Sequence, residues 1–163
     1  MNPTILVITG DAAWTRRAIH LAAAMARDAA GELRIIYLLP VARLEDLGAN
    51  AREELLPFDR YQALADWAAT AESYGVAVHV ELFEYSDYAG ALLCAAEQTG
   101  PRAIFAPPPG GRPAFVARLR EKWLRRRLGR PYFTLGPDDS PTAWSETPAE
   151  TRPMATATRE VRI

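Results

Sequence analysis

Thr4-Ile5-Leu6-Val7-Ile8-Thr9, closed by Gly10 and Asp11, is the stretch of sequence that decides the fold. Its apolar residues follow one another without the polar alternation that a solvent-exposed face would produce. Strands with this pattern are covered on both faces, as the strands of parallel sheets are. The stretch therefore predicts a central strand of a parallel α/β sheet, with a turn at Gly10 and Asp11.

Four further β-rich runs alternate with helical patterns along the chain. The predicted strands cover residues 33–39, 76–83, 103–106 and 132–135. The predicted helices cover residues 12–30, 58–74, 113–128 and a stretch from a cap at Ser86 or Asp87 to residue 99, and residues 41–57 are a long charged loop. Strands that alternate with helices imply right-handed crossovers and a doubly wound parallel sheet. We therefore expect a Rossmann-like α/β fold with five parallel strands and helices on both faces.

Residue type and spacing also predict helix ends and helix faces. Gly31 is expected to end the first helix as its C-cap. Within that helix, the spacing of five residues predicts an apolar face: Ala18, Leu21, Ala22, Met25 and Ala29. Cys94 lies in an apolar helical run, which predicts a small buried side chain rather than a nucleophile.

Length and composition fit one domain followed by a tail. The 163 residues are 49% hydrophobic, enough for one core, and the formal net charge of -1 gives no overall field that attracts nucleic acid or membranes. We expect residues 1–136 to form the α/β domain. Residues 137–163 scatter prolines among Ser, Thr, Asp and Glu without apolar periodicity, which predicts a disordered tail. No apolar run approaches the roughly 18 residues of a membrane span, and no leader precedes the first strand, so we expect a cytoplasmic protein.

Few side chains are candidates for chemistry of their own. His20 and His79 are the only histidines, and no Cys/His/Asp spacing indicates a metal site. The four serines lie outside any Gly-x-Ser-x-Gly turn, and no nucleophile–base pair emerges. Trp14 either walls the crevice at the strand ends or packs in the core. These observations predict a protein that is not an enzyme.

The expected ligand site lies at the topological switch point of the sheet, where the strand order reverses direction. Doubly wound sheets bind ligands beyond the carboxyl ends of the strands at this point, which here means residues 9–12 and 107–112. A strand–loop–helix junction of this kind normally holds anions with glycine N–H groups. This chain instead reads Pro107-Pro108-Pro109-Gly110-Gly111, and three successive prolines supply no N–H at all. The sequence indicates a nucleotide-binding architecture whose nucleotide chemistry has been altered or lost.

The last predicted helix is strongly basic. At about 100° per residue, Arg118, Lys122, Arg125 and Arg126 share a face, and an adjoining face carries apolar side chains: Phe115, Val116, Leu119 and Trp123. One interpretation is a surface for an anion, RNA or an acidic partner. The other, which we favour, is the solvated side of an amphipathic helix whose dipole favours arginines near its C-terminus. Nucleic acid is therefore not expected as a partner.

Across residues 4–135 the chain resembles the universal stress protein family. The resemblance rests on four stretches: Ile5-Leu6-Val7 opening into Gly10-Asp11, Gly100-Pro101-Arg102-Ala103-Ile104, Gly110-Gly111-Arg112, and Arg126 to Phe133. It implies an adenine nucleotide alpha hydrolase-like fold, with adenine-nucleotide contacts at Gly10, Asp11, Gly110, Gly111 and Arg112. In this family the last strand commonly pairs with its two-fold mate, which implies a homodimer.

The chain departs from the family at the positions that hold ATP. Members that bind ATP carry an aspartate just after strand one and a loop written Gly-x2-Gly-x9-Gly-Ser/Thr. Here the carboxylate of Asp11 is displaced by one position, and Pro107 stands where the first glycine belongs. The same alignment puts Arg120 and Glu121 at the Gly-Ser/Thr pair. Losing two hydrogen bonds to phosphate costs about 3–6 kcal/mol, or roughly 100- to 10,000-fold in affinity.

Three functions follow in order of preference. The first is a non-enzymatic universal stress protein-like regulatory or stress-response module that acts through dimerisation and an unknown protein partner, with weak or no ATP binding. The second is a true adenine-nucleotide binder that uses an altered phosphate loop, with ATP or AMP as ligand. The third is an enzyme of the wider adenine nucleotide hydrolase-like group, for which no catalytic loop is recognisable.

Overall fold

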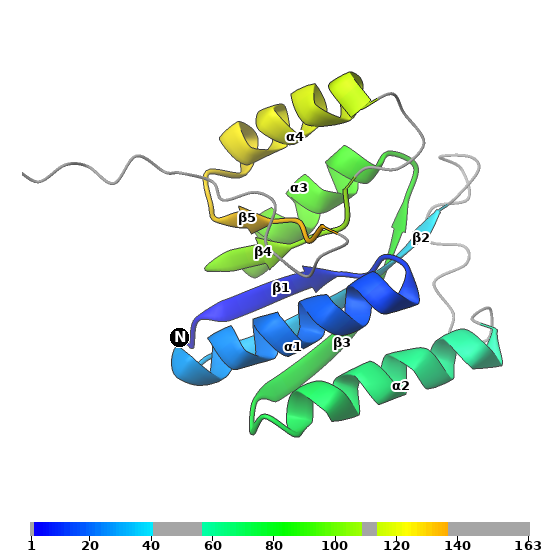
Figure 1. Ribbon diagram of the computed structural model, residues 1–163, viewed down its shortest axis with the longest axis vertical. Coiled ribbons are helices and arrows are strands. Elements are labelled where there is room, and N and C mark those ends of the chain that lie inside the picture. The colour runs from blue at the N-terminus through cyan, green and yellow to red at the C-terminus, as the bar shows by residue number, and fades with distance from the viewer. Residues whose placement is uncertain (1, 41–56, 109–113, 137–163) are drawn as a thin grey trace, which may run out of the picture.

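The computed structural model describes residues 2–40, 57–108 and 114–136, which form one parallel sheet covered by helices (Figure 1). The strands are β1 (Thr4–Ile8), β2 (Glu32–Pro40), β3 (Ala77–Tyr85), β4 (Ala103–Phe105) and β5 (Tyr132–Phe133). The helices are α1 (Ala12–Asp28), α2 (Phe58–Glu72), α3 (Tyr88–Thr99) and α4 (Ala114–Leu128). The sheet order is β3-β2-β1-β4-β5, and every pairing is parallel. The predicted five-stranded, doubly wound α/β fold is confirmed.

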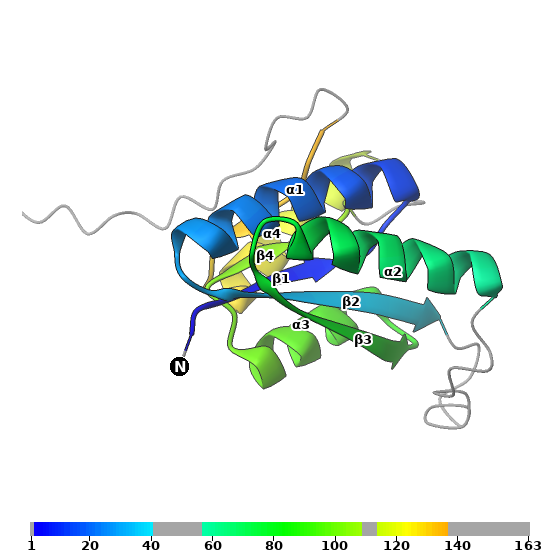
Figure 2. The same cartoon turned by 90° about the horizontal axis from the view of Figure 1, so that it is seen from below.

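The helices cover the sheet in two layers. Helices α1 and α2 lie on one face and α3 and α4 on the other (Figures 1 and 2). Each layer has its own apolar core, one around Trp14 and Trp67 and the other around Leu92 and Leu124. From β1 the sheet extends to β2 and β3 on one side, and from β4 it extends to β5 on the other. The residues that follow β1 and β4 therefore meet at the carboxyl edge of the sheet, at the topological switch point.

Strand β1 is central because both of its faces are covered. All five of its residues are buried, with Ile5, Leu6, Val7 and Ile8 fully inaccessible to solvent. Each such side chain contributes about 1.5–3 kcal/mol on burial. In register, Val7 pairs with residues of both neighbouring strands. The continuous apolar run therefore reflects contact with both helix layers.

The buried stripe of α1 differs from the predicted one. Ala18 and Ala22 are buried as expected, but Leu21 and Met25 are exposed. The helix also packs through Ile19 and Ala26. The small side chains on the packed side let the helix approach β1 closely. Leu21 and Met25 lie at the border of that contact. The buried face predicted from apolar spacing is therefore displaced by about one residue from the observed one.

The end of α1 also differs from the prediction that Gly31 is its C-cap. Ala30 adopts the left-handed conformation, with φ of 49°. The Ala30 N–H donates to Arg27 O and the Gly31 N–H donates to Ala26 O, which is the bond pattern of a Schellman motif centred on Ala30. Gly31 is needed for a different reason, since a methyl group there would lie 2.1 Å from the Pro3 carbonyl oxygen.

Cys94 was predicted to be buried, and this is wrong. Its side chain is exposed on α3, where Gln98 Nε2 lies 3.4 Å from the Cys94 sulfur. The packed side of α3 is made by Ala91, Leu92 and Ala95. The apolar run around Cys94 is longer than one helix face, so it did not fix which side is inward.

Candidate functional site

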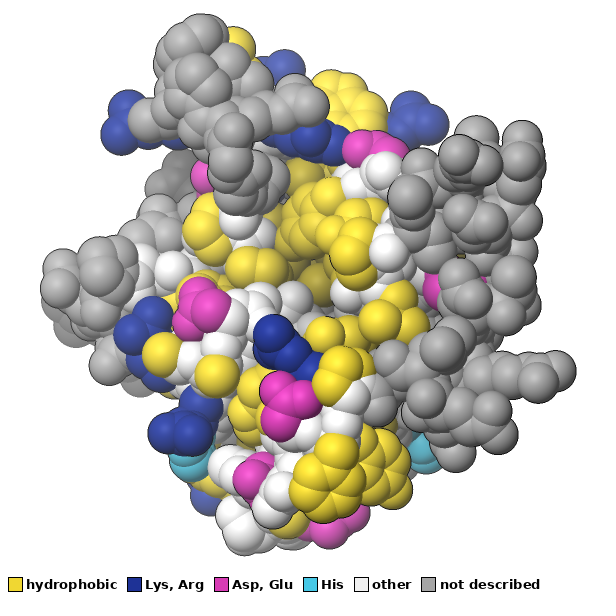
Figure 3. Space-filling view, turned by 90° about the vertical axis from the view of Figure 1, so that its right-hand side faces the viewer, with side chains coloured by type: hydrophobic (Ala, Val, Ile, Leu, Met, Phe, Trp, Pro, Cys, Tyr) yellow, Lys and Arg dark blue, Asp and Glu magenta, His cyan; other side chains and the backbone are white. Residues whose placement is uncertain are grey.

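The candidate site lies at the carboxyl edge of the sheet, between the ends of β1 and β4. Figure 3 views the molecule from the side to which β1 and β2 point, and its centre is a hollow with mainly hydrophobic side chains. Val7 and Phe105 are in register on the paired strands. Gly10 and Pro107, a few residues further along each chain segment, therefore come together.

Gly10 and Pro107 are in close contact. A methyl group built on Gly10 would lie 2.9 Å from Cβ and 3.1 Å from Cγ of Pro107, and 3.4 Å from the ring of Trp14. Contacts under about 3.0 Å are not tolerated between carbon atoms in packed proteins. The proline ring thus occupies the space directly beside the glycine, which is where a ligand would otherwise approach the end of β1.

Three of the backbone N–H groups at this edge already have protein partners. The Thr9 N–H donates to Ile36 O, and the Ala106 N–H donates to Phe133 O. The Gly10 N–H donates to Thr15 Oγ1 at 2.9 Å. Pro107 has no N–H to offer. Among these residues, no amide is available to a phosphate without breaking a bond within the protein.

Asp11 serves as the N-cap of α1. Its Oδ1 accepts a hydrogen bond of 2.9 Å from the Trp14 N–H, and its carbonyl oxygen accepts from the Thr15 N–H. Asp11 is exposed, so its negative charge lies on the solvent-facing side of the candidate site. A carboxylate in this position stabilises the helix N-terminus. The same charge disfavours a phosphate there.

Tyr88 anchors the loop that follows β4. Its hydroxyl donates a hydrogen bond of 2.9 Å to the carbonyl oxygen of Pro107. Burial raises the pKa of the Tyr88 phenol well above its ordinary value of 10.0, so the hydroxyl stays protonated and remains a donor at neutral pH. This bond joins the start of α3 to the proline segment and fixes where Pro107 sits.

An ion pair lies beside this anchor. Arg120 Nη2 of α4 donates a hydrogen bond of 2.6 Å to Asp87 Oδ1. Asp87 also caps α3, where its Oδ2 accepts from the Gly90 N–H at 2.8 Å. The Gly90 hydrogen bond is the largest cause that lowers the pKa of Asp87, and Arg120 adds to it. Arg120 is thus engaged with a carboxylate of the protein.

One polar atom at the site lacks a partner. The indole nitrogen of Trp14 is buried and makes no hydrogen bond, and Trp14 itself is 4% exposed. The prediction left open whether Trp14 walls the crevice or packs in the core. It does both, because its ring contacts the α1 core and also lies next to Gly10.

The structure places part of the predicted site. Gly10 and Asp11 lie at the switch point, while Gly110, Gly111 and Arg112 fall outside the described residues. The role of all five in nucleotide binding stays a prediction. Sequence reasoning did not identify Thr15, Tyr88 or the partner of Arg120. Thr15 lies four residues after the helix cap Asp11, and a hydroxyl side chain at this spacing was a local signal that could have identified it. Nothing local marks Tyr88, because its contact with Pro107 joins separate segments.

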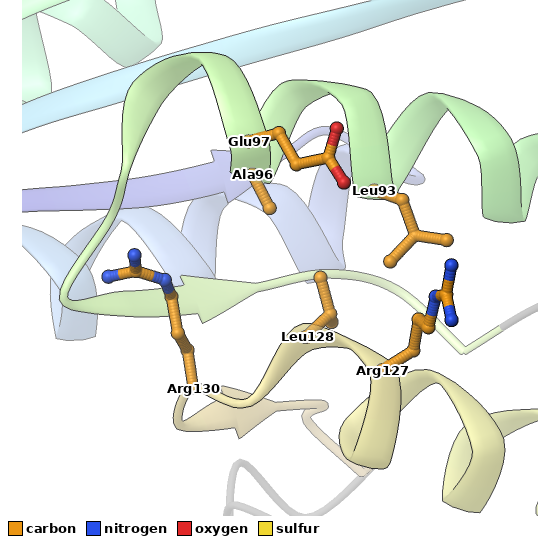
Figure 4. Close-up of a pocket in the computed structure, with 6 residues that line it drawn as sticks. All are labelled: Leu93, Ala96, Glu97, Arg127, Leu128 and Arg130. Atoms are coloured by element: carbon orange, nitrogen blue, oxygen red, sulfur yellow. The ribbon is translucent and has the colours of Figure 1, made fainter.

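A second hollow lies between helices α3 and α4, away from the carboxyl edge of the sheet. It is a groove of about 310 Å³ between the last turns of α3 and α4. Figure 4 shows Leu93, Ala96 and Leu128 forming its apolar lining, with Arg127 and Arg130 at its two ends. Arg130 donates to the carbonyl oxygens of Gly100 and Pro101, a structural role that ties the turn before β5 to the end of α3.

The described residues contain neither a metal-ligand cluster nor a membrane-spanning helix. No group of three His, Cys, Asp or Glu side chains gathers there as a metal ion would require. None of the helices in residues 2–40, 57–108 and 114–136 combines the length and apolar composition needed to cross a membrane.

The arrangement of the sheet and helices is similar to that of solved universal stress protein structures. No family model and no curated protein sequence matches the chain. Among solved structures, the fold is similar to that of a universal stress protein family member from Burkholderia pseudomallei, with a TM-score of 0.59 and 21% identity over 82% of this chain and 96% of that one. The fold implied by the sequence resemblance is confirmed.

Two similar structures were solved with nucleotides. A universal stress protein in complex with cAMP has a TM-score of 0.58 and 16% identity, and the match covers 85% of this chain and 98% of that chain. A universal stress protein from Archaeoglobus fulgidus in complex with dAMP has a TM-score of 0.53 and 15% identity, over 82% and 97% of the two chains.

Proposed function

We propose that this chain is a divergent universal stress protein that acts as a non-enzymatic regulatory or stress-response module in the cytoplasm, with an adenine-nucleotide site that is closed or strongly weakened. The contact between Gly10 and Pro107 carries the proposal, because it fills the approach to the end of β1. The bond from the Gly10 N–H to Thr15 Oγ1 supports it by occupying an amide that a phosphate would need.

The expected weakening can be estimated from the missing donors. A hydrogen bond to an ionised phosphate contributes about 1.5–3 kcal/mol. Pro107 removes one N–H, and the engaged Gly10 N–H removes a second. Together they reduce affinity by roughly 100- to 10,000-fold relative to a loop with both donors free.

Titration calorimetry with ATP and Mg²⁺ tests this function. We expect no heat of binding from the full chain up to millimolar ATP, and no nucleotide released from gently purified protein when it is analysed by mass spectrometry. Binding at micromolar ATP, or a nucleotide retained through purification, would contradict the proposal.

The second candidate is an adenine-nucleotide binder with an altered loop. Two observations favour it: structures of similar fold were solved with cAMP and dAMP, and the buried indole nitrogen of Trp14 lacks a partner at this edge. Under this reading Gly10, Asp11, Gly110, Gly111 and Arg112 line the nucleotide. Titration with AMP and cAMP alongside ATP separates the candidates, since binding of AMP without ATP would indicate a site that accepts adenosine but rejects a triphosphate.

We also propose that the protein is a homodimer paired through β5. Strand β5 is the last strand at one edge of the sheet, and an edge strand is a position at which a second copy can add by strand pairing. Sedimentation velocity of the full chain at micromolar concentration should give the mass of two chains. A monomer throughout the concentration series would exclude this assembly without affecting the proposal on nucleotide binding.

A further inference from the structure

The outward side of α4 is an unusual surface for a helix that packs on a sheet. Leu119 is 65% exposed and Trp123 is 50% exposed, although both are large apolar side chains. The helix packs inward through Leu124 and Leu128 instead. The predicted apolar face containing Leu119 and Trp123 is therefore present, but these two side chains point away from the core.

Cations border these two side chains on both sides. At about 100° per residue, Lys122 and Arg126 lie on one side of them and Arg127 on the other. We call the following exposed residues the α4 strip: Arg118, Leu119, Lys122, Trp123, Arg126 and Arg127. Figure 3 shows hydrophobic side chains between Lys and Arg side chains over α4, at the top of the molecule.

Two acids near α4 are paired with other residues, whereas Glu97 of α3 lines the same groove as Arg127. Asp87 pairs with Arg120 at 2.6 Å, and Glu121 pairs with Arg125 at 2.7 Å. No ion pair joins the four cations of the α4 strip to any residue of the described part of the chain. The strip therefore presents a charge of +4 around an apolar centre, and a binding partner should carry acids around an apolar side chain.

The chain itself contains a segment of this composition. No Lys or Arg occurs between Arg130 and Arg152, and residues 137–151 contain Trp144 and four acids: Asp138, Asp139, Glu146 and Glu150. This segment lies outside the described residues and directly follows the domain. In a protein of net charge -1, opposite charges are thus concentrated in α4 and in residues 137–151.

We propose that residues 137–151 dock on the α4 strip of the same chain, with Trp144 against Leu119 and Trp123 and the four acids facing the cations. The reach is sufficient, because eight residues from Gly136 to Trp144 span up to about 26–29 Å and the 15 residues of α4 extend about 22 Å. Covalent connection gives the segment a high effective concentration.

Disulfide trapping in the full chain tests the contact. In a Cys94→Ser background, Leu119→Cys is combined with Ser145→Cys, next to Trp144. The matched control combines Ser145→Cys with Phe58→Cys, which places the second thiol on α2, at a residue that is 79% exposed. Under mild oxidation of dilute protein, we expect the 119–145 pair to close within one chain at least tenfold faster than the 58–145 pair.

Charge provides an independent readout. High salt should remove most of the rate difference, since exposed charges are screened, and Lys122→Glu with Arg126→Glu should lower the rate of the 119–145 pair to that of the control. Equal rates for the two pairs would overturn the proposal, as would a 119–145 rate unaffected by salt and charge reversal. Disulfides formed mainly between two chains would also overturn it, by assigning the strip to a second copy.

Discussion

Gly10 and Pro107 lie against each other at the carboxyl edge of the sheet, with no room for a methyl group between them. Each residue lies two positions beyond the end of a buried strand, and the two strands are neighbours in the sheet. Glycine at position 10 and proline at position 107 therefore form one packed unit. Several consequences of this unit can be measured.

Gly10→Ala should destabilise the protein by about 1–3 kcal/mol, because the added methyl group would overlap the ring of Pro107. Pro107→Gly removes that ring, so Gly10→Ala should cost much less in the Pro107→Gly background. Urea unfolding of the two single variants and the double variant gives the coupling energy. Equal costs of Gly10→Ala in both backgrounds would show that the two residues are independent.

Pro107→Gly should also strengthen nucleotide binding. The substitution adds one backbone N–H beside β1 and removes the ring that fills the approach. One additional hydrogen bond to phosphate contributes about 1.5–3 kcal/mol, which is roughly tenfold or more in affinity. Calorimetry with ATP and Mg²⁺ measures the gain, and Pro131→Gly is a matched control before β5 that should leave binding unchanged. A similar gain in both variants would rule out local opening of the site.

Thr15→Val should cost about 1–3 kcal/mol of unfolding free energy. The change keeps the shape of this buried side chain but removes the oxygen that accepts from the Gly10 N–H. Thr15→Ser keeps the acceptor and should retain the Gly10 bond. Hydrogen exchange of the Gly10 amide provides the direct readout, with fast exchange in Thr15→Val and slow exchange in Thr15→Ser. Slow exchange in both variants would mean that another group protects this amide.

The charge of Asp87 should make stability depend on pH in acid. Its pKa in the folded protein is lower than the ordinary value of 3.8, so its contribution is present above that value and is lost as pH falls through the lowered pKa. Wild type should therefore exceed Asp87→Asn in unfolding free energy near neutral pH, and the difference should vanish in acid. A difference for Asp87→Asn that did not change with pH would show that its cap, not its charge, matters.

Ala30→Gly should stabilise the protein by about 0.5–1 kcal/mol. Ala30 has φ of 49°, and glycine adopts this left-handed conformation without the steric cost that a Cβ atom brings. Thermal unfolding measures the effect, and Ala29→Gly, at φ of -89°, is the neighbouring control that should destabilise. Loss of stability in Ala30→Gly would show that the alanine methyl group makes a favourable contact.

The order of strands and helices was predictable because its signals are local. The continuous apolar run of β1 and the helix cap predicted at Ser86 or Asp87 depend only on residues close together in the sequence. The side of a helix that packs was less predictable. Cys94 and Leu119 are exposed despite their apolar surroundings, because the packed side depends on how each helix crosses the sheet.

By itself, the sequence determined the parallel α/β order, the place of the switch point and the shortage of amide donors after β4, since proline lacks an N–H wherever it is placed. Only the tertiary structure decided that Pro107 packs on Gly10, that Thr15 takes the Gly10 amide and that Tyr88 holds the Pro107 carbonyl. These contacts depend on the register between β1 and β4 and on the approach of α3. The strand register and the position of α3 are fixed by the packing of the two apolar cores rather than by any local sequence pattern.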